Sequence, residues 1–114
     1  LKKNKKKMVL NKKIVFGITC HNSLSLAKKA ILLDSAYVAF GAFFPTKTKK
    51  VKYVADKNIL KKAKKLNTKI VAIGGITNKN YMDLLKFGAD FIAISSFVWK
   101  NKEFTPLEAI KLFK

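Results

Sequence analysis

Four short apolar runs alternate with segments of helical periodicity, and this alternation constrains the fold of the chain more than any other feature. The runs cover residues 14–18, 37–41, 69–75 and 91–95, and each is apolar at nearly every position rather than at every second position. Strands of that kind are typical of parallel sheets that are buried on both faces. Parallel strands need crossover connections, which the helical segments supply. The pattern predicts an α/β fold in the order β-α-β-α-β-α-β-α.

The segments between the apolar runs carry helix signals. Residues 23–33 and 57–66 repeat their apolar side chains at helical spacing, which predicts two amphipathic helices, the first with Asn22 or Ser23 as its N-cap. A third helix is expected after an N-cap at Thr77 or Asn78. The last helix begins after Thr105, where Thr-Pro-Leu-Glu forms a capping box with Pro at the first helical position.

The charge of the chain suggests a nucleic-acid hypothesis, which the residue types weaken. The formal net charge is +19, but every basic residue is Lys and none is Arg. The planar guanidinium group that reads guanine or binds a phosphate through two hydrogen bonds is therefore absent. Many of the lysines fall within residues 1–13, which we interpret as a poorly ordered lead or the remnant of a preceding unit. A solvated lysine surface is favoured over a nucleic-acid site.

The length, hydrophobic content and cysteine count of the chain restrict the class of protein it can be. A chain of 114 residues is enough for one domain, and its 49% of hydrophobic residues can build a core. No apolar run approaches the roughly 20 residues that a membrane-spanning helix needs. Cys20 is the single cysteine, so no internal disulfide can form. We therefore expect a cytoplasmic protein without membrane contact.

The strand-to-helix loops carry most of the chemically useful residues. Right-handed crossovers place all four of these loops on one edge of the sheet. They begin near Thr19, Phe44, Gly75 and Ser95 and contain hydroxyls, glycines or charges, whereas the turns of the opposite edge look like plain connectors. Ligands of parallel α/β proteins bind at the carboxyl ends of the strands. The functional site is therefore predicted on this edge.

Three of these loops suggest a phosphate site. Gly75 lies where a strand becomes a loop, so the backbone could approach a ligand closely, although a lone Gly-Gly pair is more typical of a plain tight turn. Ser95 and Ser96 place two hydroxyls at the end of the last strand. The loop after the second strand adds two alternating hydroxyls, which would face one side of an extended segment, and a point charge, from Thr46, Thr48 and Lys49.

The first loop leaves its function open. His21 either faces a ligand or makes a local hydrogen bond at the start of a helix, and a single histidine does not decide between them. Cys20 is not expected to be a nucleophile, because nothing in the sequence marks a lowered pKa. A cysteine at the end of a strand is more often a small buried apolar group.

Together, the four loops resemble the second half of thiamine-phosphate synthase, a family of (βα)8 barrels related to the thiazole tautomerases. The resembling segments occur in family order within residues 14–114 and read GITCHN, YVAFGAFFPTKTK, VAIGGITNKN and GADFIAISS. The resemblance implies a parallel (βα)4 half of a TIM (βα)8 barrel. It also implies a transferase, which joins hydroxymethylpyrimidine diphosphate to thiazole phosphate and yields thiamine phosphate and pyrophosphate.

The resemblance assigns roles to individual residues. Thr19 and Lys49 would contact the pyrimidine diphosphate. The thiazole-phosphate pocket would be lined by Thr46, Lys47 and Thr48. The phosphate itself would be held through the backbone N–H groups of Gly75, Ser95 and Ser96. In the family reaction, Mg²⁺ helps pyrophosphate to leave and the thiazole nitrogen captures the pyrimidine cation. No side-chain nucleophile is then needed, and catalysis rests on positioning and on stabilisation of charge.

The first half of the family barrel has no counterpart in this sequence. The resemblance places the Mg²⁺-binding aspartates in that half, so Mg²⁺ is expected as a cofactor whose ligands are absent from this chain. We expect the chain to be inactive alone and to pair with a complementary half or with itself, since a half-barrel exposes strand edges. Two alternatives stay open: a thiazole tautomerase-like protein in which His21 shuttles a proton, and a non-catalytic subunit that binds a phosphorylated ligand.

Overall fold

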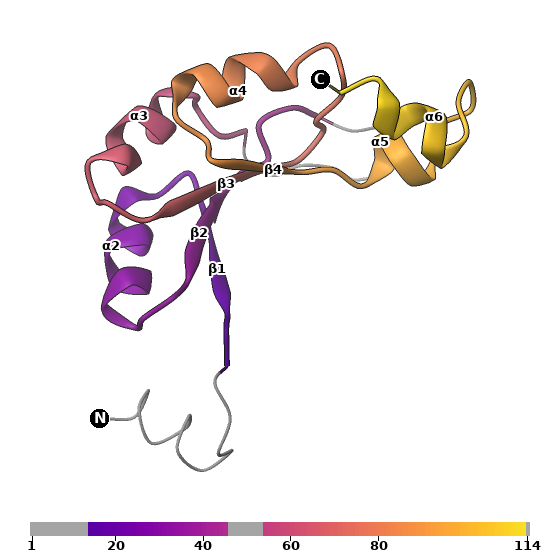
Figure 1. Ribbon diagram of the computed structural model, residues 1–114. Coiled ribbons are helices and arrows are strands. Elements are labelled where there is room, and N and C mark those ends of the chain that lie inside the picture. The colour runs from indigo at the N-terminus through magenta and orange to yellow at the C-terminus, as the bar shows by residue number, and fades with distance from the viewer. Residues whose placement is uncertain (1–13, 46–53, 114) are drawn as a thin grey trace.

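The computed structural model describes residues 14–45 and 54–113, which form a parallel four-stranded sheet with helices (Figure 1). The strands are β1 (Gly17–His21), β2 (Tyr37–Phe40), β3 (Lys69–Ile73) and β4 (Phe91–Ala93). They lie in the sheet in the order of the chain, and all three pairings are parallel. The predicted α/β order is confirmed.

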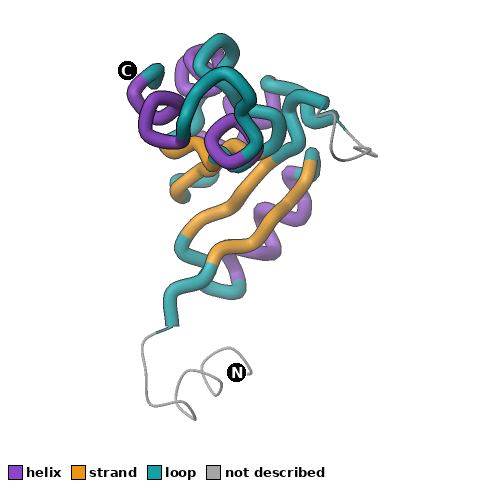
Figure 2. Tube along the Cα trace, turned by 90° about the vertical axis from the view of Figure 1, so that its right-hand side faces the viewer, coloured by secondary structure: helices purple, strands orange, loops and turns teal. Residues whose placement is uncertain are grey.

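Helices connect the strands and lie on one side of the sheet. The crossovers contain α2 (Leu24–Leu32), α3 (Asn58–Lys64) and α4 (Tyr81–Phe87), while α5 (Ser96–Trp99) and α6 (Pro106–Lys111) follow the last strand. Figure 1 shows α2, α3 and α4 together on the same face of the sheet, and Figure 2 shows the strands running past them. No helix among the described residues is long and apolar enough to cross a bilayer.

The core lies between the sheet and these three helices. Because successive strand residues point to opposite faces, every second side chain of β2 and β3 points toward the helices. Those positions are fully buried and hold Val38, Phe40, Ile70 and Ala72. From the helices they meet small and branched side chains that are also fully buried, including Ala27, Leu60, Ala63 and Leu84.

Two of the predicted caps are present. The hydroxyl of Ser23 accepts the Leu26 N–H at 3.1 Å, which decides between the two candidate caps of α2. At α6, the Thr105 hydroxyl accepts the Glu108 N–H at 3.2 Å, and the Glu108 carboxylate accepts the Thr105 N–H at 2.9 Å. The ring of Phe113 then packs edge-on against Tyr81 of α4, with centroids 5.0 Å apart. This contact fixes the last helix to the body of the fold.

The third crossover helix begins later than predicted. Neither Thr77 nor Asn78 is its N-cap, because α4 starts at Tyr81. The side-chain oxygen of Asn80 accepts the Thr77 N–H at 2.8 Å, and its amide nitrogen donates to the Gly75 carbonyl at 3.0 Å. These two bonds hold residues 77–80 as a turn, which local sequence signals did not reveal.

The opposite face of the sheet is left open by the described elements. Side chains of alternate strand residues point to it, among them Thr19, Tyr37 and Phe91. Tyr37 is 39% and Phe91 is 55% exposed, although both are large apolar side chains. The expectation that both faces are buried is therefore wrong for this part of the chain. In a closed barrel this face would be the interior, which a half-barrel cannot cover by itself.

Candidate functional site

The loop after β2 is bound to the loop after β3 by backbone hydrogen bonds. The Phe43 N–H donates to the Ile73 carbonyl at 3.3 Å, and the Phe44 N–H donates to the Gly74 carbonyl at 3.2 Å. These bonds continue the pairing of the two strands beyond their ends. The polar stretch that begins after Phe44 therefore starts directly beside the two glycines.

Both glycines are required by this close approach. Gly74 and Gly75 have φ values of 94° and 68°, which favour glycine. A Cβ atom on Gly74 would collide with Ala42, and one on Gly75 would collide with the Phe44 carbonyl. These contacts within the protein support the interpretation of the Gly-Gly pair as a tight turn. The pair lets the loops after β2 and β3 pack closely against each other.

Asn80 holds the other side of this loop. Its side chain bridges the Gly75 carbonyl and the Thr77 N–H, while the Thr77 hydroxyl accepts the Lys79 N–H at 3.2 Å. The glycine pair is therefore held from two directions, by the Phe44 N–H at the Gly74 carbonyl and by the Asn80 amide at the Gly75 carbonyl. Sequence reasoning missed Asn80, because its side chain makes no capping bond to α4 and instead reaches back to Gly75.

The loop after β4 leads at once into the short helix α5. The Ser95 carbonyl accepts the N–H groups of Val98 and Trp99, both at 3.0 Å. The amides of Ser96 and Phe97, in the first turn, have no acceptor within the helix. The Ser95 side chain is exposed and that of Ser96 is half-buried. Two hydroxyls and two backbone donors are thus gathered at the end of β4.

A pocket of about 760 Å³ joins these loops at the carboxyl ends of β3 and β4. It brings together three predicted site residues, Gly75, Ser95 and Ser96. Pro45 also lines it, so Thr46 follows a lining residue directly. Sequence reasoning missed three polar residues of the wall, Thr77, Lys100 and Asn101. A smaller hollow at the opposite edge, near Asp90, contains none of the predicted site residues.

The predicted residues of β1 lie outside this pocket. Thr19 is exposed on the open face, and two strands of the sheet lie between β1 and β4. His21 is exposed at the end of β1, and its carbonyl accepts the Gly41 N–H at 3.1 Å. Next to it, the Asn22 side chain accepts the Asp56 N–H at 3.1 Å, which ties the first loop to the start of α3. The remaining predicted residues, Thr46, Lys47, Thr48 and Lys49, lie outside the described residues.

Cys20 behaves as the sequence suggested. Its side chain is fully buried on the helix side of β1, and its sulfur lies 3.5 Å from the Ile18 carbonyl. Burial raises the pKa of the Cys20 thiol, so little thiolate forms at neutral pH. The expectation that Cys20 is not a nucleophile is consistent with both observations.

The carboxylates of the described residues do not fit a Mg²⁺ site at this edge. Asp83 pairs with Lys57 at 3.2 Å, and Asp56 accepts the Asn58 N–H at 2.9 Å. Asp90, at the amino ends of the strands, is bound by Lys64 at 2.7 Å. No carboxylate lines the 760 Å³ pocket, and this part of the chain contains no group of three His, Cys, Asp or Glu that could hold a metal ion. We therefore assign no metal ligand to these residues.

The fold and the pocket define a class of protein. Four parallel βα units with the helices on one face form half of a TIM barrel, and the loops after the last two strands of such barrels commonly bind phosphate groups. The family model described as thiamine monophosphate synthase matches residues 1–98, and the chain belongs to that family.

Curated relatives carry the same assignment. Thiamine-phosphate synthase of Pelagibacter ubique is 53% identical over 111 residues, which cover 96% of this chain and 53% of the relative. The synthase of Rhodospirillum centenum is 46% identical over 88 residues, or 76% of this chain and 42% of the relative. The synthase of Xylella fastidiosa is 36% identical over 100 residues, which cover 88% of this chain and 42% of the relative. The chain therefore spans about half the length of these relatives.

Solved structures agree on the architecture. A thiamine phosphate pyrophosphorylase of Pyrococcus furiosus superposes with a TM-score of 0.73 at 27% identity, over 96% of this chain and 53% of that protein. A native KDPGal structure superposes with a TM-score of 0.62 at 16% identity, over 87% of this chain and 48% of that protein. The second likeness shows the fold alone. In each case the superposed residues cover about half of the solved protein.

Proposed function

We propose that this chain forms the thiazole-phosphate-binding half of a thiamine-phosphate synthase, a cytoplasmic transferase that works once a complementary half completes its barrel. One observation carries the proposal. The structure joins Pro45, Gly75, Ser95 and Ser96 around one pocket, in a chain of the thiamine monophosphate synthase family. Hydroxyl and amide donors at this place in a TIM barrel suit a phosphorylated small molecule.

In this proposal the pocket binds the phosphate of the thiazole substrate. The backbone N–H groups of Gly75 and Ser96 and the serine hydroxyls would donate to its oxygens. Lys100, which is exposed and lines the same pocket, adds a positive charge beside them. The donors Thr46, Lys47 and Thr48 follow Pro45 in the chain and would close the pocket from that side.

The second substrate would lie across the open face. Thr19 and Lys49 are assigned to the pyrimidine diphosphate, at the carboxyl ends of the first two strands. The described lining of the pocket contains no His, Asp or Glu that could act as a general base for the serine hydroxyls, so this half would act by holding the thiazole ring against the pyrimidine carbon. Mg²⁺, which the family assignment implies, would be held by the complementary half.

Neither alternative function is favoured by a specific observation. The tautomerase hypothesis needs His21 close to the thiazole, but His21 does not line the pocket that contains Gly75 and Ser96. A non-catalytic binding subunit would use the same pocket without turnover. Measuring thiamine phosphate formation by the chain together with its complementary half distinguishes such a subunit from a synthase.

Calorimetric titration with thiazole phosphate tests the pocket directly. The chain, alone and with its complementary half, should bind the ligand saturably. The double variant Thr46→Ala and Thr48→Ala should bind at least ~10-fold more weakly, because each lost hydrogen bond to a charged group contributes about 1.5–3 kcal/mol. Thr68→Ala, at the opposite edge, is the control and should bind as the unchanged chain does. Equal affinity of the double variant would remove these threonines from the site.

A further inference from the structure

Two successive peptide units of the loop after β3 are each held by their carbonyl group. The Gly74 carbonyl accepts the Phe44 N–H at 3.2 Å, and the Gly75 carbonyl accepts the Asn80 amide at 3.0 Å. In a trans peptide unit the N–H points away from the carbonyl. The Gly75 N–H therefore points away from the loop after β2. Because β3 lies between β2 and β4, this N–H faces the side of the loop after β4.

The N–H groups of Gly75 and Ile76 are both available to a ligand of the pocket. Within residues 14–45 and 54–113, neither N–H has a hydrogen-bond acceptor. Both residues line the 760 Å³ pocket, and Ile76 is only 3% exposed. An unpaired N–H in a buried residue is costly, so nearly all such groups have a partner. An anionic oxygen of a bound ligand can supply it to both residues at once.

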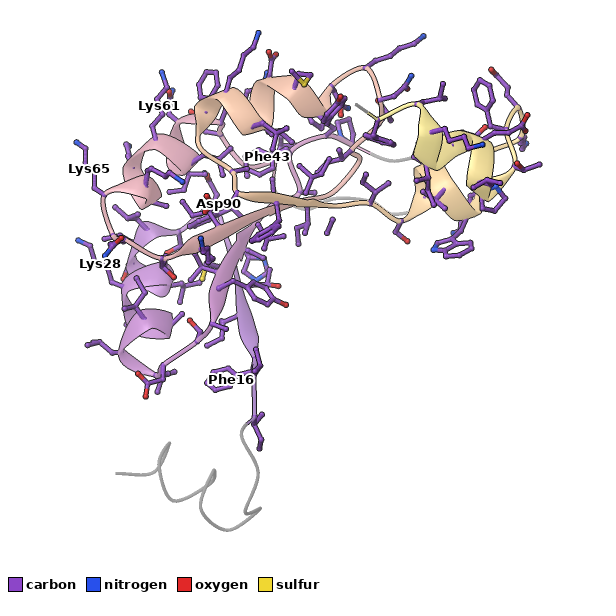
Figure 3. All side chains as sticks on the ribbon, viewed as in Figure 1. Phe16, Lys28, Phe43, Lys61, Lys65 and Asp90 are labelled. Atoms are coloured by element: carbon purple, nitrogen blue, oxygen red, sulfur yellow. The ribbon has the colours of Figure 1, made fainter. Side chains whose placement is uncertain are left out.

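The two carbonyl groups are held by different means. The loop that holds the Gly74 carbonyl is anchored by Phe43, whose side chain is buried in the core beneath α4 (Figure 3). The Phe43 N–H also donates to the Ile73 carbonyl at 3.3 Å, so this hold comes from backbone that is fixed in the core. The Gly75 carbonyl depends instead on one side chain, that of Asn80, among the residues that the structure describes.

The glycine at position 75 makes the Asn80 side chain important. Glycine has wide backbone freedom, so the peptide unit between Gly75 and Ile76 could rotate if its carbonyl were released. Rotation would turn the carbonyl oxygen toward the pocket and the Ile76 N–H away from it. An anion would then meet a carbonyl oxygen in place of a donor. The Asn80 oxygen accepts the Thr77 N–H at 2.8 Å, which keeps the side chain in the orientation that prevents this rotation.

We propose that Asn80 is a positioning residue for phosphate binding, because its amide holds the Gly75 carbonyl and so keeps the Gly75 and Ile76 N–H groups directed at the phosphate oxygens. This inference rests on the proposed function, which makes thiazole phosphate the ligand of the pocket. Asn80 does not itself line the pocket. It therefore acts through the loop, and its effect is on the affinity for the phosphate group.

Calorimetric titration of two asparagine variants with thiazole phosphate tests the role of Asn80. Asn78 is the matched control, because it lies in the same turn and its side chain makes no hydrogen bond within the described residues. Asn80→Ala should bind at least ~10-fold more weakly than the unchanged chain, since hydrogen bonds to a charged group are lost. Asn78→Ala should stay within about twofold.

A spectroscopic measurement separates positioning from a merely structural role. The chain has five glycines, so isotope labelling of the glycine nitrogens alone gives a spectrum in which Gly75 can be followed. Saturation with thiazole phosphate should move the Gly75 amide proton downfield in the unchanged chain and in Asn78→Ala, and much less in Asn80→Ala. A loss of stability alone would leave the shift at saturation unchanged.

Asn80→Asp is a second variant that keeps the turn. Its carboxylate can accept the Thr77 N–H but cannot donate to the Gly75 carbonyl, so we expect weak binding and a small Gly75 shift again. Asn78→Asp adds the same charge to the same turn and is its control. Equal affinities of these two variants, or a full Gly75 shift in either Asn80 variant, would overturn the inference alone. An unchanged chain that does not bind thiazole phosphate, or binds it without moving the Gly75 signal, would overturn the proposed function as well.

Discussion

Asp90 shows how one carboxylate can connect three parts of this fold. It follows α4, accepts a hydrogen bond from Ile70 of β3 and pairs with Lys64 of α3. The hydrogen bond from Lys64, followed by the Ile70 N–H and the charges of Lys64 and Lys69, holds the Asp90 pKa below its usual value despite partial burial. The sequence did not indicate this role, because Asp90 lies in an ordinary turn and its partners are distant in the chain.

The Asp90 interaction predicts a pH-dependent stability. A carboxyl whose pKa is lowered in the folded state stabilises it above the unfolded pKa of about 4, and the contribution is lost as pH falls through the folded pKa. Asp90→Ala should therefore lower the free energy of unfolding by about 1–3 kcal/mol at pH 7. Urea unfolding at several pH values should show this difference shrinking below about pH 4. A difference that stays constant down to pH 2 would contradict the assignment.

Gly75 provides a second prediction at the scale of single residues. Gly75→Ala should destabilise the chain by about 1–3 kcal/mol, because the new Cβ collides with the Phe44 carbonyl and the backbone has a positive φ. Gly88→Ala is the matched control, since Gly88 also has a positive φ but its nearest contact would be 3.3 Å away. Thermal unfolding should place Gly75→Ala below Gly88→Ala. The reverse order would mean that the contact between the two loops matters little.

At the scale of helices and strands, the sequence predicted the helix starts that are set by hydrogen bonds between residues close together in the chain. The caps at Ser23 and Thr105 were recognisable because each involves residues three positions apart. The start of α4 was not, because it depends on the Asn80 amide reaching back to Gly75. The pocket was predicted in part. Parallel topology brings Gly75 and Ser96 to one edge, whereas Lys100 joins them only through the path of the chain after α5.

The capping box of α6 gives a prediction for a whole element. Thr105→Ala should cost about 1 kcal/mol of stability, since the Glu108 N–H loses its acceptor at the start of the helix. Glu103→Ala, on an exposed side chain in the preceding loop, is the control and should stay within about 0.5 kcal/mol. Chemical denaturation of both variants measures the difference. An unchanged midpoint for Thr105→Ala would show that packing through Phe113 alone holds α6.

At the scale of the whole fold, the described residues form a sheet that helices cover on one face. The pattern of strands and loops sufficed to predict four parallel βα units and the edge that carries the pocket. It could not show that one face of the sheet remains open, because all-apolar strands look the same whether the second cover lies in the same chain or in another. The chain spans about half of its relatives, and the open face, Thr19 and the pocket all border the space that the remaining half would fill.

Formation of thiamine phosphate by separately prepared and mixed halves would show whether this chain is one half of a synthase. The chain, the unmatched part of the Pelagibacter ubique synthase and their mixture are each supplied with both substrates and Mg²⁺, and the product is measured by chromatography. We expect thiamine phosphate from the mixture and none from either part alone. Turnover by this chain alone, or a stable complex that binds both substrates without forming product, would contradict it.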